Sequence, residues 1–152
     1  CTDLEPEILR CIADRQLPNG NWNSYWWRGH QYGTWVTLRF LHTLGKQDLM
    51  GNSDPEKPRF YVSETMLQQA CNAGTELFRF GVTPTLNEVL FPILQQQQEK
   101  GSWDPGPDLR VTSPMCIRPW VAPAGDYFVD VKSTITTATC MTVLANALKA
   151  GL

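Results

Sequence analysis

The stretch QLPNGNWNSYWWRGHQYGTWVTLRFLHTL, residues 16–44, decides the fold of this chain. It contains four of the six Trp and two of the four Tyr. It opens with a Gln-x-x-x-Gly-x-Trp motif formed by Gln16, Gly20 and Trp22, and it passes through an aromatic patch into apolar residues at helical spacing. We therefore expect a turn, an aromatic insert and then a helix of about 34–44.

The same motif recurs in the second half of the chain. EILRCIADRQLPNGNW, residues 7–22, aligns without gaps on EVLFPILQQQQEKGSW, residues 88–103, which places Gln97, Gly101 and Trp103 at the motif positions. Sequence repeats of this kind are typical of helical arrays that bury one continuous core. The Gly permits a tight turn, the Trp ring covers apolar surface, and the Gln amide is expected to satisfy a helix terminus.

Apolar residues at helical spacing predict further helices near residues 5–16, 64–80 and 133–150. Ser63 is the expected N-cap of the middle helix. The last helix is apolar on two sides, which is typical of a buried helix.

One more helix is expected after residue 84. Thr85 and Glu88 have the spacing of a capping box, and apolar residues follow on one side. Pro92 lies inside this pattern, so the helix is expected either to kink there or to start late. Residues 101–129 carry five Pro and no regular period, which predicts a long loop of the kind that is usually functional or disordered.

Composition excludes several classes of function. A net charge of −2 and a pI near 5.6 provide no basic stripe, so we predict no nucleic-acid partner. No apolar run approaches the roughly 20 residues of a spanning helix. The five Cys are widely spread and never in Cys-x-x-Cys spacing, which predicts reduced, mostly buried thiols and a cytoplasmic location. The chain begins at Cys1 and enters a helix almost at once, which suggests a piece of a longer protein.

The two motifs resemble the QW motif of squalene-hopene cyclases and prenyltransferase-like repeat proteins. GNWNSYWWRGHQYGTWVTLRFLHTLG, residues 20–45, looks like the turn, aromatic patch and Tyr-Gly-Thr helix of that family. DVKSTITTATCMTVLANAL, residues 130–148, looks like the Asp/Ser/Thr-led helix of another repeat. The resemblance covers about two-thirds of the chain. It implies an all-α fold of the α/α-barrel (toroid) type, as a partial ring.

Within this fold we predict a single domain over residues 1–152. Its repeat units are expected at about 1–45 and 82–152, linked by 46–81. An open array leaves apolar faces uncovered, so we expect self-association or a partner chain that completes the barrel.

The resemblance also implies an acid. Class II terpene cyclases protonate an alkene with an Asp-x-Asp-Asp motif, whose central carboxyl must stay protonated. The nearest match here is Asp130-Val131-Lys132-Ser133, which keeps the first Asp and replaces the other two. Asp130 is therefore the candidate catalytic acid, and the alternative is a helix N-terminal residue that favours the helix dipole.

Three further acids, Asp104, Asp108 and Asp126, border the same long loop as Asp130. Two of the four could form an acid pair or hold magnesium. Their spacing does not follow a magnesium motif, so we predict neither a metal nor a cofactor.

The aromatic patch supplies the candidate substrate-binding residues. Its rings could line an isoprenoid pocket and stabilise carbocations by cation–π contact, or they could simply pack between helices. Its Arg and His could bind a diphosphate or shuttle a proton, or hold a loop by hydrogen bonds. These candidates are Tyr25, Trp26, Trp27, Arg28, His30 and Tyr32.

Two functions follow from these observations. The first is a terpene cyclase-like domain, an isomerase or lyase if it is an enzyme, that acts on or binds a linear isoprenoid such as a prenyl diphosphate or a squalene-type chain. The alternative is a non-catalytic helical repeat domain that binds a hydrophobic ligand or a partner chain. Peripheral contact with a membrane is compatible with both.

Overall fold

The computed structural model describes residues 4–51, 63–110, 115 and 127–152. Within these residues the chain forms five α-helices, one 3-10 helix and two short strands. In chain order they are α1 (Leu4–Asp14), α2 (Gln31–Thr43), η1 (Gln47–Met50), α3 (Met66–Phe80), α4 (Pro84–Gln95), β1 (Leu109–Arg110), β2 (Tyr127–Phe128) and α5 (Thr134–Lys149).

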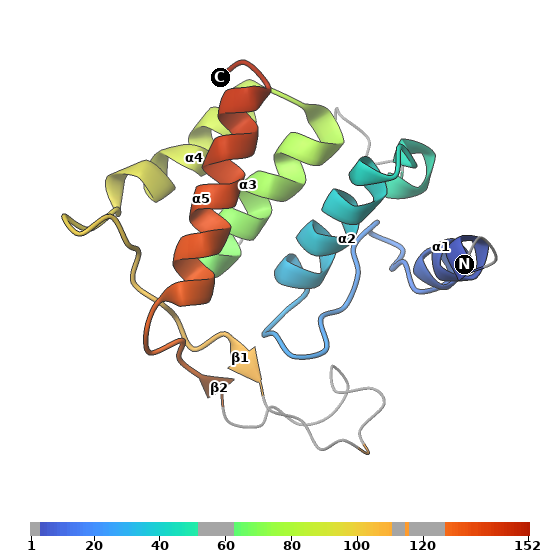
Figure 1. Ribbon diagram of the computed structural model, residues 1–152, viewed down its shortest axis with the longest axis horizontal. Helices are drawn as coiled ribbons and strands as arrows, with labels where there is room; N and C mark the ends of the chain where they lie inside the picture. Colours follow the sequence, from blue (N-terminus) through green and yellow to red (C-terminus); the bar gives the residue numbers. More distant parts are fainter. Residues whose placement is uncertain (1–3, 52–62, 111–114, 116–126) are drawn as a thin grey trace.

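Helix α3 is the centre of the bundle and packs against α2, α4 and α5 (Figure 1). The main core gathers buried apolar side chains from all four helices, including Trp35, Leu67, Leu90 and Val143. Helix α2 closes tightly on α3 because Gly74 has no side chain: a Cβ there would lie 2.3 Å from Trp35 Nε1. The segment expected to link the two repeat units therefore contains the central helix of the fold.

Helix α1 lies at the edge of the molecule (Figure 1) and contains no buried residue. Its half-buried Leu9 and Ile12 pack against a second, smaller core. That core consists of Trp22, Leu38, Leu41 and Met50. The first repeat thus has its own apolar cluster beside the main core.

The Trp of each repeat motif forms the same hydrogen bond. Trp22 Nε1 donates to the Ile12 carbonyl at 2.8 Å, and Trp103 Nε1 donates to the Ile93 carbonyl at 2.6 Å. Both carbonyl groups lie in the last turn of the preceding helix, where backbone carbonyl groups have no intrahelical N–H donor. The indole therefore closes the helix end while its ring is buried in a core.

The Gln of each motif has a different role from the one expected. Gln16 Nε2 donates to the Gly20 carbonyl at 3.1 Å, and Gln97 Nε2 donates to the Gly101 carbonyl at 3.2 Å. The amide thus holds the turn and not the helix terminus. Both glycines have positive φ, 79° and 82°, which explains why the turn requires glycine.

Two predicted helix starts are wrong by two residues. The N-cap of α3 is Thr65, whose side chain accepts the Gln68 N–H, and not Ser63. The N-cap of α4 is Thr83, so Thr85 lies inside the helix. In both helices the N-cap is a Thr in extended conformation that lies two residues from the N-cap predicted from the sequence.

The described part of the predicted long loop contains the two strands. They pair antiparallel, with Leu109 opposite Phe128 and Arg110 opposite Tyr127. The fold is otherwise all-α, as predicted. No helix in the described ranges is both long and apolar enough to cross a membrane.

Three cysteines lie in the described part of the chain, and all three are free thiols. Cys71 and Cys140 are buried, as predicted, whereas Cys11 is half-buried. Burial raises the pKa of Cys140 to about 12, which makes this thiol unreactive at neutral pH. Cys1 and Cys116 lie outside the described residues.

Candidate functional site

The two repeats differ in the connection that follows the Trp. The Trp22 N–H donates to Thr34 Oγ1 at 3.0 Å across 12 residues, and the Trp103 N–H donates to Thr137 Oγ1 at 3.4 Å across 34 residues. The second connection is therefore longer by 34 − 12 = 22 residues. The longer connection contains β1 and β2, and several of its residues line a cavity.

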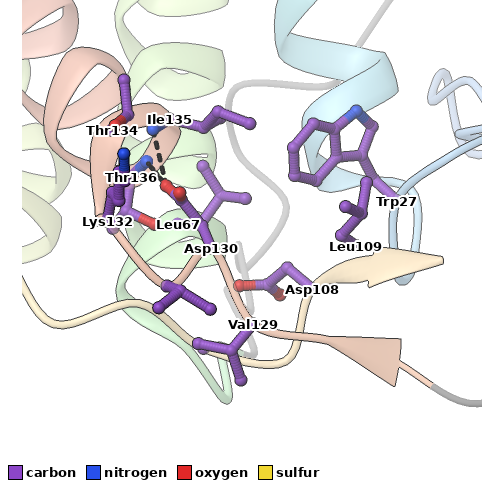
Figure 2. A pocket seen from close by; sticks show the side chains of 12 residues that line it. Trp27, Leu67, Asp108, Leu109, Val129, Asp130, Lys132, Thr134, Ile135 and Thr136 are labelled. Atoms are coloured by element: carbon purple, nitrogen blue, oxygen red, sulfur yellow. Dashed lines mark hydrogen bonds between the residues drawn. The ribbon is translucent and has the colours of Figure 1, made fainter.

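This cavity, of ≈ 310 Å³, lies at the N-terminal end of α5 (Figure 2). Its apolar wall includes Trp27, Leu67, Leu109 and Ile135. Its ionisable groups come from two segments: the carboxyl group of Asp108 lies just before β1, and the carboxyl group of Asp130 and the ammonium group of Lys132 lie between β2 and α5. Apolar walls with a few polar groups are typical of small-molecule sites.

The aromatic patch reaches the cavity by pairing with β1. Trp27 forms an antiparallel bridge with Leu109. The bridge is flanked by two backbone hydrogen bonds, from Arg28 N to the Asp108 carbonyl and from Arg110 N to the Trp26 carbonyl, both 2.7 Å long. This pairing sets the Trp27 side chain on the cavity wall (Figure 2).

The ring of Tyr32 packs against the ring of Trp27. The two rings stack with centroids 4.4 Å apart, and Tyr32 in turn meets Trp35 edge-on at 5.9 Å. Tyr32 lies in the first turn of α2, which starts three residues before the predicted helix. Two of the six predicted binding residues thus come together, Trp27 on the wall and Tyr32 packed against it.

The other four predicted binding residues do not line this cavity. Tyr25 and Trp26 pack edge to face with centroids 4.9 Å apart, and Trp26 is 47% exposed. Arg28 forms an ion pair with Glu64. His30 is the N-cap residue of α2, and burial, with a smaller effect of Arg79, lowers its pKa.

Asp130 closes the N-terminus of α5. Its Oδ2 accepts the backbone N–H groups of Ile135 at 2.6 Å and Thr136 at 3.3 Å (Figure 2). These contacts match the helix N-terminal role expected as the alternative to acid catalysis. Lys132, which stands at the central position of the Asp-x-Asp-Asp pattern, is exposed at the cavity.

Asp108 is the buried acid of the cavity, with 3% of its surface exposed. Its Oδ1 accepts hydrogen bonds from Thr65 Oγ1 at 2.9 Å and from Gln68 Nε2 at 3.0 Å. Its Oδ2 is buried and has no hydrogen-bond partner in the described part of the chain. Burial raises the pKa of Asp108, although both hydrogen bonds and the nearby charge of Arg28 act in the opposite direction.

The sequence placed Asp108 among four acids that border the loop but did not distinguish it. Asp104 is exposed and accepts a hydrogen bond from Gln98, and Asp126 lies outside the described residues. One local signal was available, because Gly106 precedes Asp108 by two residues. A Cβ at Gly106 would lie 2.2 Å from Thr65 Cγ2 and 3.0 Å from Asp108 Oδ2, so a residue without a side chain is needed where Thr65 approaches Asp108.

Over the described ranges the structure contains no group of three or more His, Cys, Asp or Glu side chains that could hold a metal ion.

Comparison with known proteins identifies the fold. No protein-family model and no curated protein sequence matches the chain. Among solved structures, the chain is similar to the type II terpene cyclase MstE from Scytonema in its apo form, with a TM-score of 0.74 and 21% identity over 98% of this chain and 53% of the enzyme. A variant of MstE in complex with geranylgeranyl dihydroxybenzoate, its substrate, matches with the same TM-score and identity over 98% of this chain and 51% of the variant.

These matches extend over nearly the whole chain, although it spans only about half the length of either solved structure. The mostly helical fold described above agrees with that likeness. The chain therefore has the fold of a type II terpene cyclase.

Proposed function

We propose that this chain is a terpene cyclase-like domain that binds a linear isoprenoid in the cavity at the N-terminal end of α5. The observation that supports this proposal is an apolar-walled cavity with two carboxyl groups in a fold shared with a type II terpene cyclase. A solved structure with this fold holds a geranylgeranyl compound, which supports the class of ligand. The volume of ≈ 310 Å³ is at the low end for ligand sites and suits a short isoprenoid or one end of a longer chain.

Trp27 is the main contact for the hydrocarbon in this proposal. Its ring is held by Tyr32 on one side and by the backbone bridge to Leu109. A ring fixed in this way offers a rigid apolar face, which can also stabilise a positive charge that develops on the ligand. Asp130 is the acid that the family resemblance implies, and it lies on the same cavity.

The remaining predicted binding residues belong to the outer part of the proposed site. Tyr25, Trp26, Arg28 and His30 lie on the same short segment as Trp27. They are proposed to contact parts of a longer isoprenoid that extend beyond the cavity, and Arg28 and His30 are the polar groups available to its head group.

Binding can be tested by titrating the protein with prenyl diphosphates, prenyl alcohols and squalene while Trp fluorescence is recorded. We expect saturable quenching that is lost in Trp27→Phe and retained in Trp26→Phe, because only the first ring lines the cavity. Mass spectrometry of the same mixtures would detect cyclised products. Quenching that is unchanged in Trp27→Phe would contradict the assignment of the site.

A second candidate function is a non-catalytic domain that binds a hydrophobic ligand or a partner chain. Two observations favour it. The acid motif has Lys132 and Ser133 in place of two Asp, and large apolar side chains are exposed on α4 and α5. Saturable isoprenoid binding without any product would favour this function over the first.

A further inference from the structure

The carboxyl group of Asp108 has one oxygen with two hydrogen-bond partners and one oxygen with none. Oδ1 accepts hydrogen bonds from Thr65 Oγ1 at 2.9 Å and from Gln68 Nε2 at 3.0 Å. Oδ2 is buried and has no hydrogen-bond partner within the described residues. A buried polar atom without a partner is costly, so one that is retained calls for an explanation.

Oδ2 is the oxygen of Asp108 on the side of the cavity. Thr65 and Gln68, which hold Oδ1, do not line the cavity, whereas Gly106 does. Oδ2 lies beside Gly106, since a Cβ built there would lie 3.0 Å from it. Figure 2 shows the Asp108 side chain among the residues that line the cavity. The oxygen without a partner is therefore the one that a bound molecule can reach.

Two further hydrogen bonds fix the orientation of the Asp108 carboxyl. Thr65 Oγ1 accepts the Gln68 backbone N–H at 3.3 Å, which leaves the hydroxyl proton of Thr65 for Asp108 Oδ1. Gln68 Oε1 accepts the Glu64 backbone N–H at 3.2 Å, which turns the Nε2 of this amide toward Oδ1. Both groups that meet Oδ1 are donors, so any proton on the carboxyl lies on Oδ2.

Asp130, the other acid of the cavity, has no comparable atom. Its Oδ2 accepts the backbone N–H groups of Ile135 and Thr136, and the residue is half-buried. Neither of its oxygens is both buried and without a partner in the described ranges. Among the residues that line the cavity, only Asp108 has a buried polar side-chain atom that lacks a partner in the described part of the chain.

A hydroxyl group fits Oδ2 in both protonation states of Asp108. The ionised carboxyl needs a donor at Oδ2 and the protonated carboxyl needs an acceptor, and an alcohol O–H can serve as either. Burial raises the pKa of Asp108, so the protonated state has to be accommodated as well as the ionised one.

Other ligand groups fit Oδ2 less well. A hydrocarbon has neither a donor nor an acceptor, and an ammonium group has only donors. A diphosphate would place its negative charges beside the carboxyl groups of Asp108 and Asp130, which is unfavourable. The chemistry of the cavity therefore favours an alcohol.

We propose that the cavity binds the hydroxyl end of an isoprenoid alcohol, with the hydroxyl group hydrogen-bonded to Asp108 Oδ2. This inference rests on the proposed function for the isoprenoid, whereas the hydroxyl group is inferred from the surroundings of Asp108. Asp108 selects the alcohol over a hydrocarbon of the same shape, because a hydroxyl group buried without a partner is unfavourable. The carbon chain packs against the apolar wall, which includes Trp27, Leu67, Leu109 and Ile135.

This selectivity can be measured with geraniol and with the hydrocarbon that has the same carbon skeleton but no hydroxyl group. Both are titrated into the wild type and into Asp108→Leu while Trp fluorescence is recorded. The ratio of the dissociation constants, hydrocarbon over alcohol, should fall by at least about tenfold in Asp108→Leu, because the hydroxyl group loses its partner. The ratio should be unchanged in Asp104→Asn, whose side chain is exposed and does not line the cavity.

A second measurement does not depend on the folding of Asp108→Leu, which leaves Thr65 and Gln68 without their acceptor. Asp108→Asn keeps an acceptor for both, and the infrared carboxyl band that this variant lacks identifies the band of Asp108. In the wild type, geraniol should shift this band to a position that the hydrocarbon does not produce, because only the alcohol can form a hydrogen bond with the carboxyl.

The possible results separate the two proposals. If geraniol, geranyl diphosphate and the hydrocarbon all fail to bind, the proposed function is refuted. If the ligands bind with the same ratio in the wild type and Asp108→Leu, or give the same band position, the alcohol is refuted alone, as expected if water is the partner of Oδ2. Loss of the preference in Asp130→Asn but not in Asp108→Leu would overturn the assignment to Asp108. Tighter binding of geranylamine than of geraniol would overturn the alcohol as the ligand class.

Discussion

The buried indole of Trp103 performs two tasks at one residue, since its ring fills the core and its N–H serves the end of α4. We expect Trp103→Phe to lower the free energy of unfolding by about 1–3 kcal/mol, because the Ile93 carbonyl is left without this donor. Urea denaturation would measure the change. Trp26→Phe is the matched control and should stay within about 0.5 kcal/mol, since Trp26 is 47% exposed. Equal losses in the two variants would contradict the role of the indole N–H.

Asp108 should give the protein a distinctive pH dependence. Its pKa is raised in the folded state, so the folded protein binds more protons than the unfolded chain between about pH 3.9 and the raised value. Its contribution to the free energy of unfolding therefore falls as pH rises through this window. Asp108→Asn should lack this fall, and the difference between the wild type and this variant should shrink with increasing pH.

When the wild type is compared with Asp108→Asn, the contributions of the other titrating groups to the pH dependence cancel. His30, for example, has a lowered pKa, so it causes a loss of stability when pH falls below about 6.5 in both proteins. Chemical denaturation at several pH values would provide the data. A difference that is constant with pH would mean that the pKa of Asp108 is unchanged by folding, and one that grows with pH would mean that it is lowered; either result would contradict the prediction.

The two acids show which site residues a sequence can reveal. Asp130 was singled out because residues 130–133 resemble the Asp-x-Asp-Asp motif and precede a predicted helix, and its partners, Ile135 and Thr136, lie only five and six residues away. The partners of Asp108 are Thr65 and Gln68, 43 and 40 residues away. No local spacing encodes such contacts, so the acid with the more unusual environment was not singled out.

The contact between helices α2 and α3 depends on the absence of a side chain at Gly74. Gly74→Ala would place a Cβ 2.3 Å from the ring of Trp35, and we expect this variant to lower the free energy of unfolding by about 1–3 kcal/mol. Thermal or urea unfolding would measure the loss. In the double variant Gly74→Ala/Trp35→Phe, the smaller ring should recover part of it. Additive losses would indicate that the two residues do not compete for space.

The helices were predictable from the sequence because their apolar periodicity is local. The structure confirms helices near all five predicted positions. Helix α4 nevertheless starts earlier than expected, because Thr83 is its N-cap and Pro84 occupies the first turn, where its missing N–H costs nothing. Pro92 remains within that helix, so the expected late start is wrong.

The strands could not be predicted in the same way. Each is two residues long, and their pairing joins Leu109 to Phe128 and also brings Trp27 beside Leu109. Such short strands show no alternation, and their partners are distant in sequence. The position of Trp27 in the cavity therefore became apparent only from tertiary structure.

Two helices of the molecule expose large apolar side chains to solvent. The side chains that are more than half exposed on α4 and α5 are Phe91, Leu94, Met141 and Leu148. We expect self-association that rises with protein concentration and is reduced in Phe91→Glu/Leu94→Glu, because burial of apolar side chains is favourable. Light scattering after size-exclusion chromatography would measure the mass. Val36→Glu on α2 is the control, and a stable monomer at all concentrations would contradict the prediction.

The hydrogen bonds of the two motif Trp residues have a consequence for the order in which the chain folds. Each bond joins residues only 10 apart in sequence, from Ile12 to Trp22 and from Ile93 to Trp103. Closing a loop of that size takes about 10–100 ns, whereas contacts across 40 residues must overcome a larger entropy of loop closure. Two local nuclei can thus form independently, one in each repeat. We expect the cavity to assemble at the end of folding, because its walls come from segments distant in the sequence, at Trp27, Leu67, Asp108 and Ile135.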